Sequence, residues 1–339
     1  MLKVSVIIPV YNAGKYLNRT LNSILKQTYK DYEIICINDV SKDNSSDILE
    51  VFAQKDERIK VLNNKKNLGA ALTRNVGIDM AKGDYIYFLD ADDYIDEKYL
   101  ECMVQKIEHE NCNIVLNMSI QSESNGNISQ FHHPSMPTIK PNGEYMDNIR
   151  TTHDAPCFIW ARIYRKSFLN EYNLRFLNIH ATDDVVFNAI VNMYTDKTFV
   201  FYGEKYHYTV NNNSVTGVAK SVDDRDLQHI KAHSMIYDYL KKHNKLDKNL
   251  KLFRVYPFMK VDTEEKFIFY KNFFEKIKTN FNENESIYND MEKFFAYSLL
   301  NTSTYEEYLA NYNKVVTIGF LRQGKNSVSN VAGSEKEYQ

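Results

Sequence analysis

Residues 85–93 read Tyr-Ile-Tyr-Phe-Leu-Asp-Ala-Asp-Asp, a short apolar run that ends in three carboxylates. The apolar part, Tyr85–Leu89, predicts a strand that is buried on both faces. In an open α/β sheet, ligands bind beyond the carboxyl ends of the strands. We expect Asp90, Asp92 and Asp93 at that edge, where hard oxygen ligands suit Mg²⁺ or Mn²⁺ shared with substrate phosphates. An isolated Asp-x-Asp is more often a solvated acidic turn before a helix, and the sequence upstream of it is what favours a ligand site here.

The composition limits the class of protein. A length of 339 residues allows one large domain or two ordinary ones. A net charge of −2 gives no reason to expect a nucleic-acid partner. The four cysteines have neither zinc nor redox spacing, so nothing requires an oxidising compartment. The apolar run Val4–Val10 is too short for a signal peptide or a membrane span. We therefore expect a cytoplasmic protein, either soluble or peripheral to the membrane.

Apolar residues alternate between strand and helix patterns along the first part of the chain. The strands expected before and after residues 85–89 are Lys3–Ile8, which Pro9 should end, Asp31–Asn38, Arg58–Leu62 and Asn113–Ile120. Helical periodicity occupies the segments between them, in units of about thirty residues, which predicts βαβ units and a mostly parallel sheet. Gly-x-Gly-x-x-Gly and the P-loop pattern are both missing, which argues against a dinucleotide site and a P-loop NTPase.

The second half of the chain changes character. We expect a surface loop at 121–143, a strand at 157–164, a helix at 183–192 and short aromatic strands at 199–202 and 206–210. From about residue 226 to 312 the pattern is helical, and from 324 it has no periodicity, which predicts a disordered tail. The expected division is an α/β domain at 1–215, a helical region at 216–323 and the tail at 324–339.

Four stretches of the first 215 residues resemble the family-2 glycosyltransferases of the GT-A fold. They are VSVIIPVYNAGKYL (Val4–Leu17), CINDVSKDNS (Cys36–Ser45), NLGAALTRNVGIDMAKGDYIYFLDADD (Asn67–Asp93) and a later Asp183-Asp184 pair followed by VVFN. Their order and spacing are those of the family, and the third stretch is the most specific. The resemblance implies a Rossmann-like α/β domain with a mostly parallel sheet, and it does not extend beyond about residue 215.

The resemblance implies donor-binding roles for Pro9, Tyr11, Asp39, Arg74, Asp90, Asp92 and Asp93. In the family, the loop after the first strand packs on the base or ribose. Asp39 matches the acid that accepts a hydrogen bond from uracil, and Arg74 matches a basic residue near the diphosphate. Asp92 matches the direct metal ligand, Mn²⁺ or Mg²⁺, and Asp90 matches the acid that holds the ribose or the waters of the metal. On the residues alone, Asp39 could instead start a turn, and Arg74 could pair with a structural carboxylate.

The same resemblance makes Asp184 the catalytic base, with Asp183 as the fallback. Inverting transfer is an in-line displacement at the anomeric carbon, so a carboxylate must take the proton of the acceptor hydroxyl on the face opposite the nucleoside diphosphate. A divalent cation stabilises the charge that develops on the leaving group. Both acids would also suit the first turn of a helix for electrostatic reasons alone.

Two further side chains have open interpretations. His207 could complete the metal site through its imidazole, as in some GT-A enzymes, or it could be a core or surface histidine. Trp160, the only tryptophan, could stack on the acceptor sugar or belong to the core. The chain also departs from the family, because Val40 stands where glycine is usual, Thr73 where alanine is frequent and Asp183 where glutamate is usual.

Basic and aromatic residues alternate between Lys251 and Lys278. This pattern is typical of a membrane-surface helix, of a helix that packs on the catalytic domain, or of a homodimer interface.

The function expected from the resemblance is inverting, metal-dependent transfer of a hexose or N-acetylhexosamine. The donor is expected to be a UDP-sugar, and the acceptor a glycan or lipid-linked saccharide of a growing bacterial surface glycan, such as lipooligosaccharide (lipopolysaccharide) or capsule, met at the inner face of the membrane. Two alternatives remain. One is a non-catalytic partner that binds nucleotide sugar or glycan, and the other is a nucleotidyltransferase.

Overall fold

The computed structural model describes residues 3–311 except 125, 132–139, 141, 148–157, 180–181, 196, 211–221, 247–260 and 289. The chain forms two compact units, Met1–Phe253 and Arg254–Gln339. In the described part of the chain, no helix is long and apolar enough to cross a membrane.

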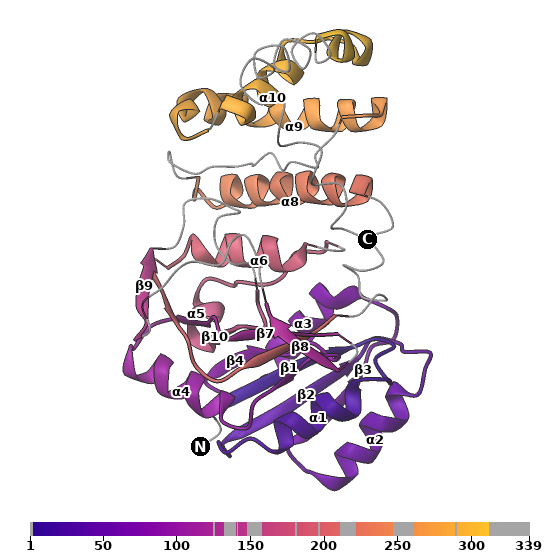
Figure 1. Cartoon of the computed structure of the whole chain (residues 1–339), viewed down its shortest axis with the longest axis vertical. Helices are drawn as coiled ribbons and strands as arrows, with labels where there is room; N and C mark the ends of the chain where they lie inside the picture. Colours follow the sequence, from indigo (N-terminus) through magenta and orange to yellow (C-terminus); the bar gives the residue numbers. More distant parts are fainter. Residues whose placement is uncertain are drawn as a thin grey trace. The chain divides into compact units, whose positions relative to one another are not determined.

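A large mixed sheet organises the first unit (Figure 1). Its strand order is β3-β2-β1-β4-β10-β6-β11-β9. The strands are β1 (Val4–Val10), β2 (Tyr32–Asn38), β3 (Ile59–Asn63), β4 (Tyr85–Phe88), β6 (Ile114–Asn117), β9 (Glu144–Asp147), β10 (Arg162–Arg165) and β11 (Lys197–Phe201). The pairs β3-β2, β2-β1, β1-β4 and β6-β11 are parallel, and β10 runs antiparallel between β4 and β6. The predicted α/β fold with a mostly parallel sheet is confirmed.

Helices cover both faces of this sheet. They are α1 (Leu17–Leu25), α2 (Ser45–Lys55), α3 (Gly69–Met80), α4 (Tyr99–His109), α5 (Lys166–Glu171) and α6 (Asp183–Asn192), and α8 (Val222–Lys242) packs on α6. In Figure 1, α3 and α6 lie above the sheet, whereas α1, α2 and α4 lie below it. Helix α3 lies close to the sheet because its Gly77 faces Ile7 of β1. A Cβ added at Gly77 would lie 2.3 Å from the Ile7 side chain. β1, β2 and β4 are covered on both sides and are almost entirely buried, as their continuous apolar sequences predict.

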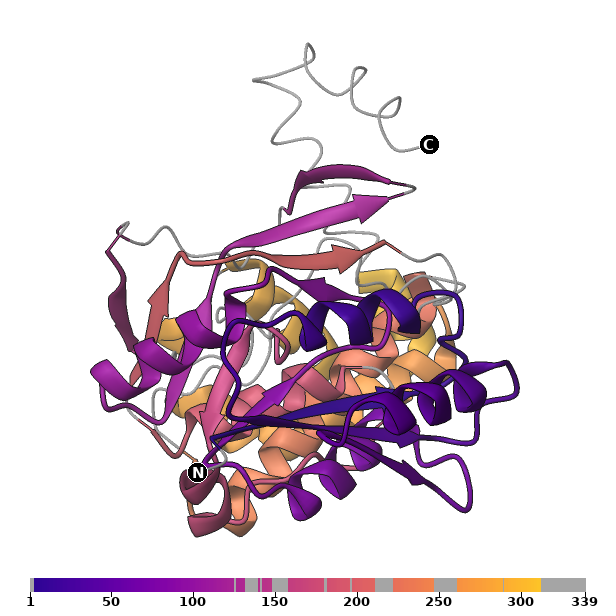
Figure 2. The same cartoon turned by 90° about the horizontal axis from the view of Figure 1, so that it is seen from below.

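A second, smaller sheet has the order β5-β12-β7-β8. Its strands are β5 (Tyr94–Ile95), β7 (Ile120–Ser124), β8 (Asn127–Gln130) and β12 (Tyr206–Thr209). Figure 2 shows the β7–β8 hairpin (magenta) beyond the dark α1 helix. The prediction of a surface loop over 121–143 is therefore wrong for its first part. An Asn-Gly pair at 125–126 precedes β8, and Gly126 has φ +83°, which is the conformation that a tight hairpin turn requires.

The strand boundaries correct two other predictions. β1 continues through Pro9 to Val10. Proline has no N–H to donate, but β4 pairs with β1 only as far as Ile7, so no ladder hydrogen bond is lost at Pro9. The strand predicted at 157–164 is shorter and later, since the chain turns at 159–161 before β10 begins at Arg162.

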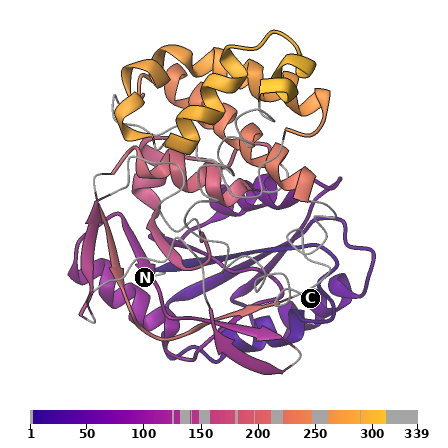
Figure 3. The same cartoon turned by 45° about the horizontal axis from the view of Figure 1, so that its top comes forward.

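The second unit is helical in its described residues. It contains α9 (Glu264–Glu283), a 3₁₀ turn at Glu285–Ile287 and α10 (Asp290–Leu300). Figure 3 shows α9 and α10 side by side, in orange and yellow. The aromatic face of α9 is buried in this unit: Tyr270 and Phe274 both meet Phe295 of α10, with ring centres 6.0 and 5.9 Å apart. Residues 251–260, the start of the basic-aromatic segment, lie outside the described residues.

The domain boundary expected after residue 215 falls in 211–221, also outside the described residues. The compact first unit extends beyond it, because α8 packs against α6. That the catalytic domain ends at 215 stays a prediction, as does the disordered tail at 324–339.

Candidate functional site

The candidate site lies at the carboxyl ends of β1, β2 and β4. The chain passes from β1 outward through β2 to β3 and then returns to place β4 on the other side of β1. Such a reversal of strand order opens a crevice at the sheet edge, which is where ligands bind in α/β folds. Asp39 follows β2 and Asp90 lies just beyond β4, while Pro9 lies near the end of β1 and Tyr11 follows that strand. Tyr11 is 50% exposed, as a side chain available to a ligand should be.

Asp39 is a buried carboxylate that organises the loop before α3. Its Oδ1 accepts hydrogen bonds from Leu68 N–H at 2.8 Å and Asn64 Nδ2 at 2.7 Å, and its Oδ2 accepts from Gly69 N–H at 2.9 Å. A carboxylate has about four acceptor positions. These three bonds therefore leave room for one further donor, such as a ring N–H of a base.

Val40, next to Asp39, has φ +64°. This left-handed conformation suits glycine and is strained for a β-branched residue. The left-handed conformation explains why glycine would be favoured at this position, and Val40 adopts it despite its side chain. The neighbouring turn is held by Asp43, whose carboxylate accepts from Gly14 N–H at 2.8 Å and Ser45 N–H at 3.0 Å. Burial alone would raise the pKa of Asp43, but the hydrogen bond from the Ser45 hydroxyl and the bonds from these two N–H groups outweigh it and lower the pKa.

Arg74 joins two groups of acids that are far apart in the sequence. From the middle of α3, its Nη2 donates to Asp90 Oδ1 at 2.7 Å and its Nη1 donates to Asp183 Oδ2 at 2.5 Å. Its side chain is only 7% exposed and lies over the Phe176 ring. Burial lowers the pKa of Arg74, but the charges of Asp183 and Asp90 outweigh this and raise it. The guanidinium is therefore held between the Asp-x-Asp turn and the start of α6.

Asp184 lies next to this cluster, in the first turn of α6, where it accepts from Val185 N–H at 2.8 Å. Burial and the neighbouring Asp183 charge raise its pKa to about 7, although Val185 N–H and Arg74 act in the opposite direction. A carboxyl group with a pKa near the working pH is suited to accept a proton in a reaction. Asp183, the preceding residue, is the ion-pair partner of Arg74.

Asp93 points to the small sheet. Its carboxyl group is 1% exposed and accepts from Tyr206 Oη at 2.5 Å and Thr209 N–H at 2.7 Å. Burial, with Asp92 and Asp90 nearby, raises its pKa well above the usual range. In this structure the Asp93 carboxyl group is bound to β12. The expected role of Asp93 in binding the sugar donor therefore stays a prediction, and the geometry does not support it.

His207 and Trp160 are tied to other side chains. His207 Nε2 lies 2.8 Å from Asp96 Oδ1, and its ring stacks on Tyr94. Successive strand residues face opposite ways, so His207 faces away from the side on which Tyr206 meets Asp93. Trp160 is buried and stacks on Tyr206, with ring centres 4.3 Å apart. The core alternative describes Trp160 better than acceptor stacking does, and the metal role of His207 stays a prediction.

The carboxylates of Asp90 and Asp92 are the groups that fit a divalent cation. Within the described residues, no group of three or more His, Cys, Asp or Glu side chains could hold a metal ion. Mg²⁺ and similar ions are commonly held by one or two carboxylates together with substrate phosphates. The half-buried Asp90, whose side chain is 28% exposed, and Asp92 beside it match that incomplete protein ligand set.

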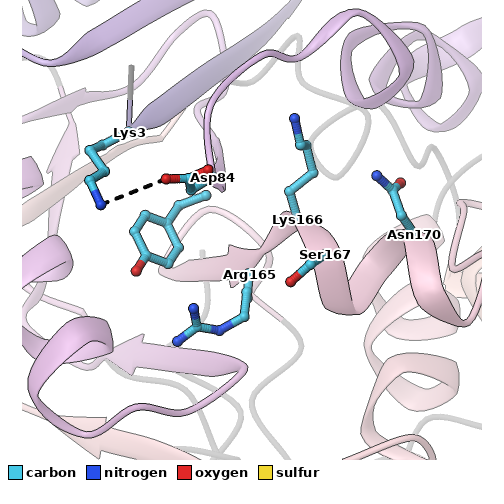
Figure 4. Close-up of a pocket in the computed structure, with 7 residues that line it drawn as sticks. Lys3, Asp84, Arg165, Lys166, Ser167 and Asn170 are labelled. Carbon is cyan, nitrogen blue, oxygen red and sulfur yellow. Dashed lines mark ion pairs between the residues drawn. The ribbon is translucent and has the colours of Figure 1, made fainter. Parts of the chain in front are cut away.

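A surface pocket of about 380 Å³ opens at the other edge of the sheet (Figure 4). Lys3 precedes β1 and Asp84 precedes β4, so this is the edge of their amino ends. Its cations do not converge: Lys3 pairs with Asp84, while Arg165 and Lys166 point apart in Figure 4. The pocket therefore lacks the features of a ligand site, and the carboxyl edge remains the candidate.

Sequence reasoning missed several residues that hold this edge. Thr20 of α1 donates to the carbonyls of Ala91 and Asp93, at 2.9 and 2.7 Å. Arg19 reaches the Asp92 carbonyl, and Asn64 reaches Asp39. These are contacts between distant segments, and no local pattern in the sequence could reveal them. Arg74 was found through its motif, but its partner Asp183 could not be inferred without the structure.

Comparison with known proteins identifies the class. Residues 5–172 match the family model described as Glycosyl transferase family 2, and the chain belongs to this family. Glycosyltransferase GlyG of Streptococcus pneumoniae is 42% identical over 126 residues, which are 37% of this chain and 42% of that protein. The putative glycosyltransferase EpsH of Bacillus subtilis is 29% identical over 217 residues, 62% of each chain. The chain spans less than two thirds of the length of these curated relatives.

Solved structures extend the likeness over nearly the whole chain. The crystal structure of S. aureus TarS 1–349 has a TM-score of 0.70 at 21% identity and covers 95% of this chain and 92% of that chain. The same protein in complex with UDP-GlcNAc has a TM-score of 0.67 at 19% identity, with the same coverage. At these identities the likeness establishes the fold, a GT-A domain followed by helices.

Proposed function

We propose that this chain is an inverting glycosyltransferase that moves a hexose or N-acetylhexosamine from a UDP-sugar to a hydroxyl of a bacterial surface glycan. The observation that carries the proposal is the Arg74 bridge, which brings the Asp-x-Asp turn and the acids of α6 to one sheet edge. Family membership supports the reaction class. The complex of TarS with UDP-GlcNAc, a protein of the same fold, supports UDP as the nucleotide.

The nucleotide would lie at the ends of β1 and β2. Asp39 keeps an acceptor position for the uracil N–H, and the exposed Tyr11 ring offers a surface for the base or ribose. Asp90 and Asp92 would hold Mn²⁺ or Mg²⁺, which when bound stabilises the charge on the diphosphate oxygens. Arg74 lies beside Asp90 and supplies a fixed positive charge near the diphosphate.

Asp184 would accept the proton of the acceptor hydroxyl as that oxygen attacks the anomeric carbon. The hydroxyl oxygen forms the new glycosidic bond, the bond from the anomeric carbon to the diphosphate breaks, and the electron pair leaves with UDP. Attack opposite the leaving group inverts the anomeric configuration. The pKa of Asp184, about 7, makes it basic enough to take a proton and keeps a useful fraction ionised at neutral pH. Asp183 keeps Arg74 in place beside it.

The proposed acceptor is a glycan or lipid-linked saccharide met at the inner face of the cytoplasmic membrane. For the second unit, peripheral membrane contact and formation of a homodimer are alternative roles within this proposal. The buried aromatic face of α9 favours packing within that unit over insertion of this face into lipid.

A thermal-shift titration with UDP, GDP and CDP, each with Mn²⁺ or with EDTA, tests the donor site. A ligand that binds only the native state raises the melting temperature, by an amount equivalent to about 2.7 kcal/mol at a hundredfold excess over its Kd. We expect a shift with UDP that needs Mn²⁺ and is lost in Asp92→Asn. No response to any of the three nucleotides at millimolar concentration would contradict the proposal. Binding without sugar transfer would favour the non-catalytic alternative, and transfer of the nucleotide itself would favour a nucleotidyltransferase.

A further inference from the structure

We infer that Arg19 is a positioning residue for the metal and diphosphate site. It would act by fixing the backbone of the Asp90–Asp93 turn, and the inference rests on the function proposed above. Arg19 lies on α1, outside the stretches that carry the family resemblance. Its Nη2 donates to the carbonyl oxygen of Asp92 at 3.1 Å and to Thr209 Oγ1 at 2.6 Å. Its Nη1 pairs with Glu123 Oε2 at 2.7 Å.

These contacts come from three separate parts of the chain. Glu123 belongs to β7, Thr209 ends β12, and Asp92 belongs to the turn after β4. The guanidinium also lies over the ring of Tyr94, 4.4 Å from its centre. Burial and the Glu123 carboxylate raise the pKa of that tyrosine to about 12, so its ring stays neutral beneath the cation. One planar fork therefore joins the small sheet to the turn.

The carbonyls of three successive turn residues accept hydrogen bonds from α1 and β12. Thr20, also on α1, takes the carbonyls of Ala91 and Asp93, while Arg19 and Thr209 Oγ1 take that of Asp92, the latter at 2.6 Å. Groups that fix the residues around a metal ligand commonly change metal affinity by about 10–100-fold when they are removed. Fixing the Asp92 peptide would hold its carboxylate ready for the cation.

A lysine cannot replace this arrangement. Its single ammonium can keep the ion pair with Glu123, but it lacks the planar fork that reaches the Asp92 carbonyl and Thr209 at once. The chain offers a matched control in Arg58, which pairs with Asp56 at 2.6 Å and lies over the Tyr32 ring at 4.6 Å. Arg58 precedes β3 and touches none of the candidate site residues.

The test compares Arg19→Lys with Arg58→Lys in the full chain. The readout is the Mn²⁺ concentration that gives half of the UDP-dependent thermal shift, with the melting temperature without ligand measured in parallel. We expect Arg19→Lys to raise this concentration by about tenfold or more, the lower end of the effect for such supporting groups. Arg58→Lys should leave this Mn²⁺ concentration unchanged. The two variants should have similar melting temperatures without ligand.

Thr209→Val replaces the hydroxyl group by a methyl group and is the second variant if Arg19→Lys does not fold. It should raise the Mn²⁺ requirement in the same direction. A wild-type Mn²⁺ requirement in the folded Arg19 variant, or in the Thr209 variant used in its place, would overturn the inference. A wild-type protein that shows no UDP and Mn²⁺ response would overturn the proposed function, and this inference with it.

Discussion

The Asp90–Asp93 turn has two sides, and the same residue type meets opposite surroundings on them. On one side Asp90 is half-buried and faces Arg74, Asp183 and Asp184. On the other side Asp93 is fully buried and faces Tyr206 and Thr209 of the small sheet. The first side has several charges and limited access to solvent, whereas the second has one carboxyl group enclosed by hydrogen-bond donors.

This difference shows that what faces an acid decides its role. A carboxylate that shares one cation with other acids can exchange partners when a ligand arrives, because one guanidinium does not balance several acidic groups. A carboxyl group buried among a hydroxyl and a backbone N–H is part of the scaffold, and removing it leaves those donors unsatisfied. Three acids in four residues look alike in the sequence, yet the structure separates a half-buried, charged side, which we propose to be the reactive side, from an enclosed, structural side.

Among variants of the turn, the largest expected effect is on the reactive side. Asp90→Asn should lower kcat/KM for sugar transfer by about 10²–10³-fold, the range for losing one preorganised charged group. The fold should persist, because the asparagine oxygen still accepts from Arg74. Steady-state kinetics with circular dichroism would check this. Asp93→Asn is the matched control and should keep most of the activity; equal losses in both variants would remove the distinction between the sides.

Asp93→Ala should reduce the free energy of unfolding by about 2–5 kcal/mol, because a buried hydroxyl and a buried N–H lose their acceptor. Asp93→Asn should lie within about 1 kcal/mol of wild type, since an amide can accept from Thr209 N–H and donate to Tyr206 Oη. Urea denaturation of both variants measures the difference. A stable Ala variant would mean that Asp93 has no structural role.

The pH dependence should differ between wild type and Asp184→Asn. The folded-state pKa of Asp184, about 7, lies above the ordinary value of 3.8, so the folded protein holds this proton more tightly. The associated stability is fully present below about pH 4 and is lost as pH rises to about 7. In wild type, transfer needs the ionised carboxylate, so the rate should rise through pH 7. Denaturation from pH 4 to 8 and a pH–rate profile would check both; identical stability profiles for the two proteins would contradict the raised pKa.

The smallest expected effect is at Val40, in the loop beside Asp39. Val40→Gly should stabilise the protein by about 1 kcal/mol, because glycine adopts φ +64° without strain. Val40→Ala keeps a Cβ and should recover only part of this gain. A calorimetric melting temperature for each variant provides the comparison, and a destabilised glycine variant would show that the valine side chain packs favourably there.

Patterns along the chain were sufficient to predict the parallel sheet and the helix at Asp183–Asn192. Each of these elements has a continuous apolar run or a helical period of its own. The small sheet was missed because β5 is only two residues long and β8 is fully exposed, so neither has an apolar pattern. Helix α5 was also missed.

The acids of the candidate site could be named from motifs in the sequence. Which of them face the charged side of the turn and which face the small sheet could not be predicted. Whether Asp93 faces a ligand or a strand depends on β12, more than a hundred residues later in the chain. The Arg74 bridge to Asp183 and the Arg19 contacts are of the same kind. Such contacts follow from the packing of helices on the sheet, which no local pattern records.

The central claim is that Asp184 performs the chemistry at a donor site built by other residues. The most direct measurement compares UDP release from UDP-sugars with UDP binding, in wild type and in Asp184→Asn, in the presence of Mn²⁺. The account predicts release by wild type, and in the variant it predicts unchanged UDP affinity with release reduced by about 10²–10⁴-fold. Release at the wild-type rate by Asp184→Asn would contradict the account.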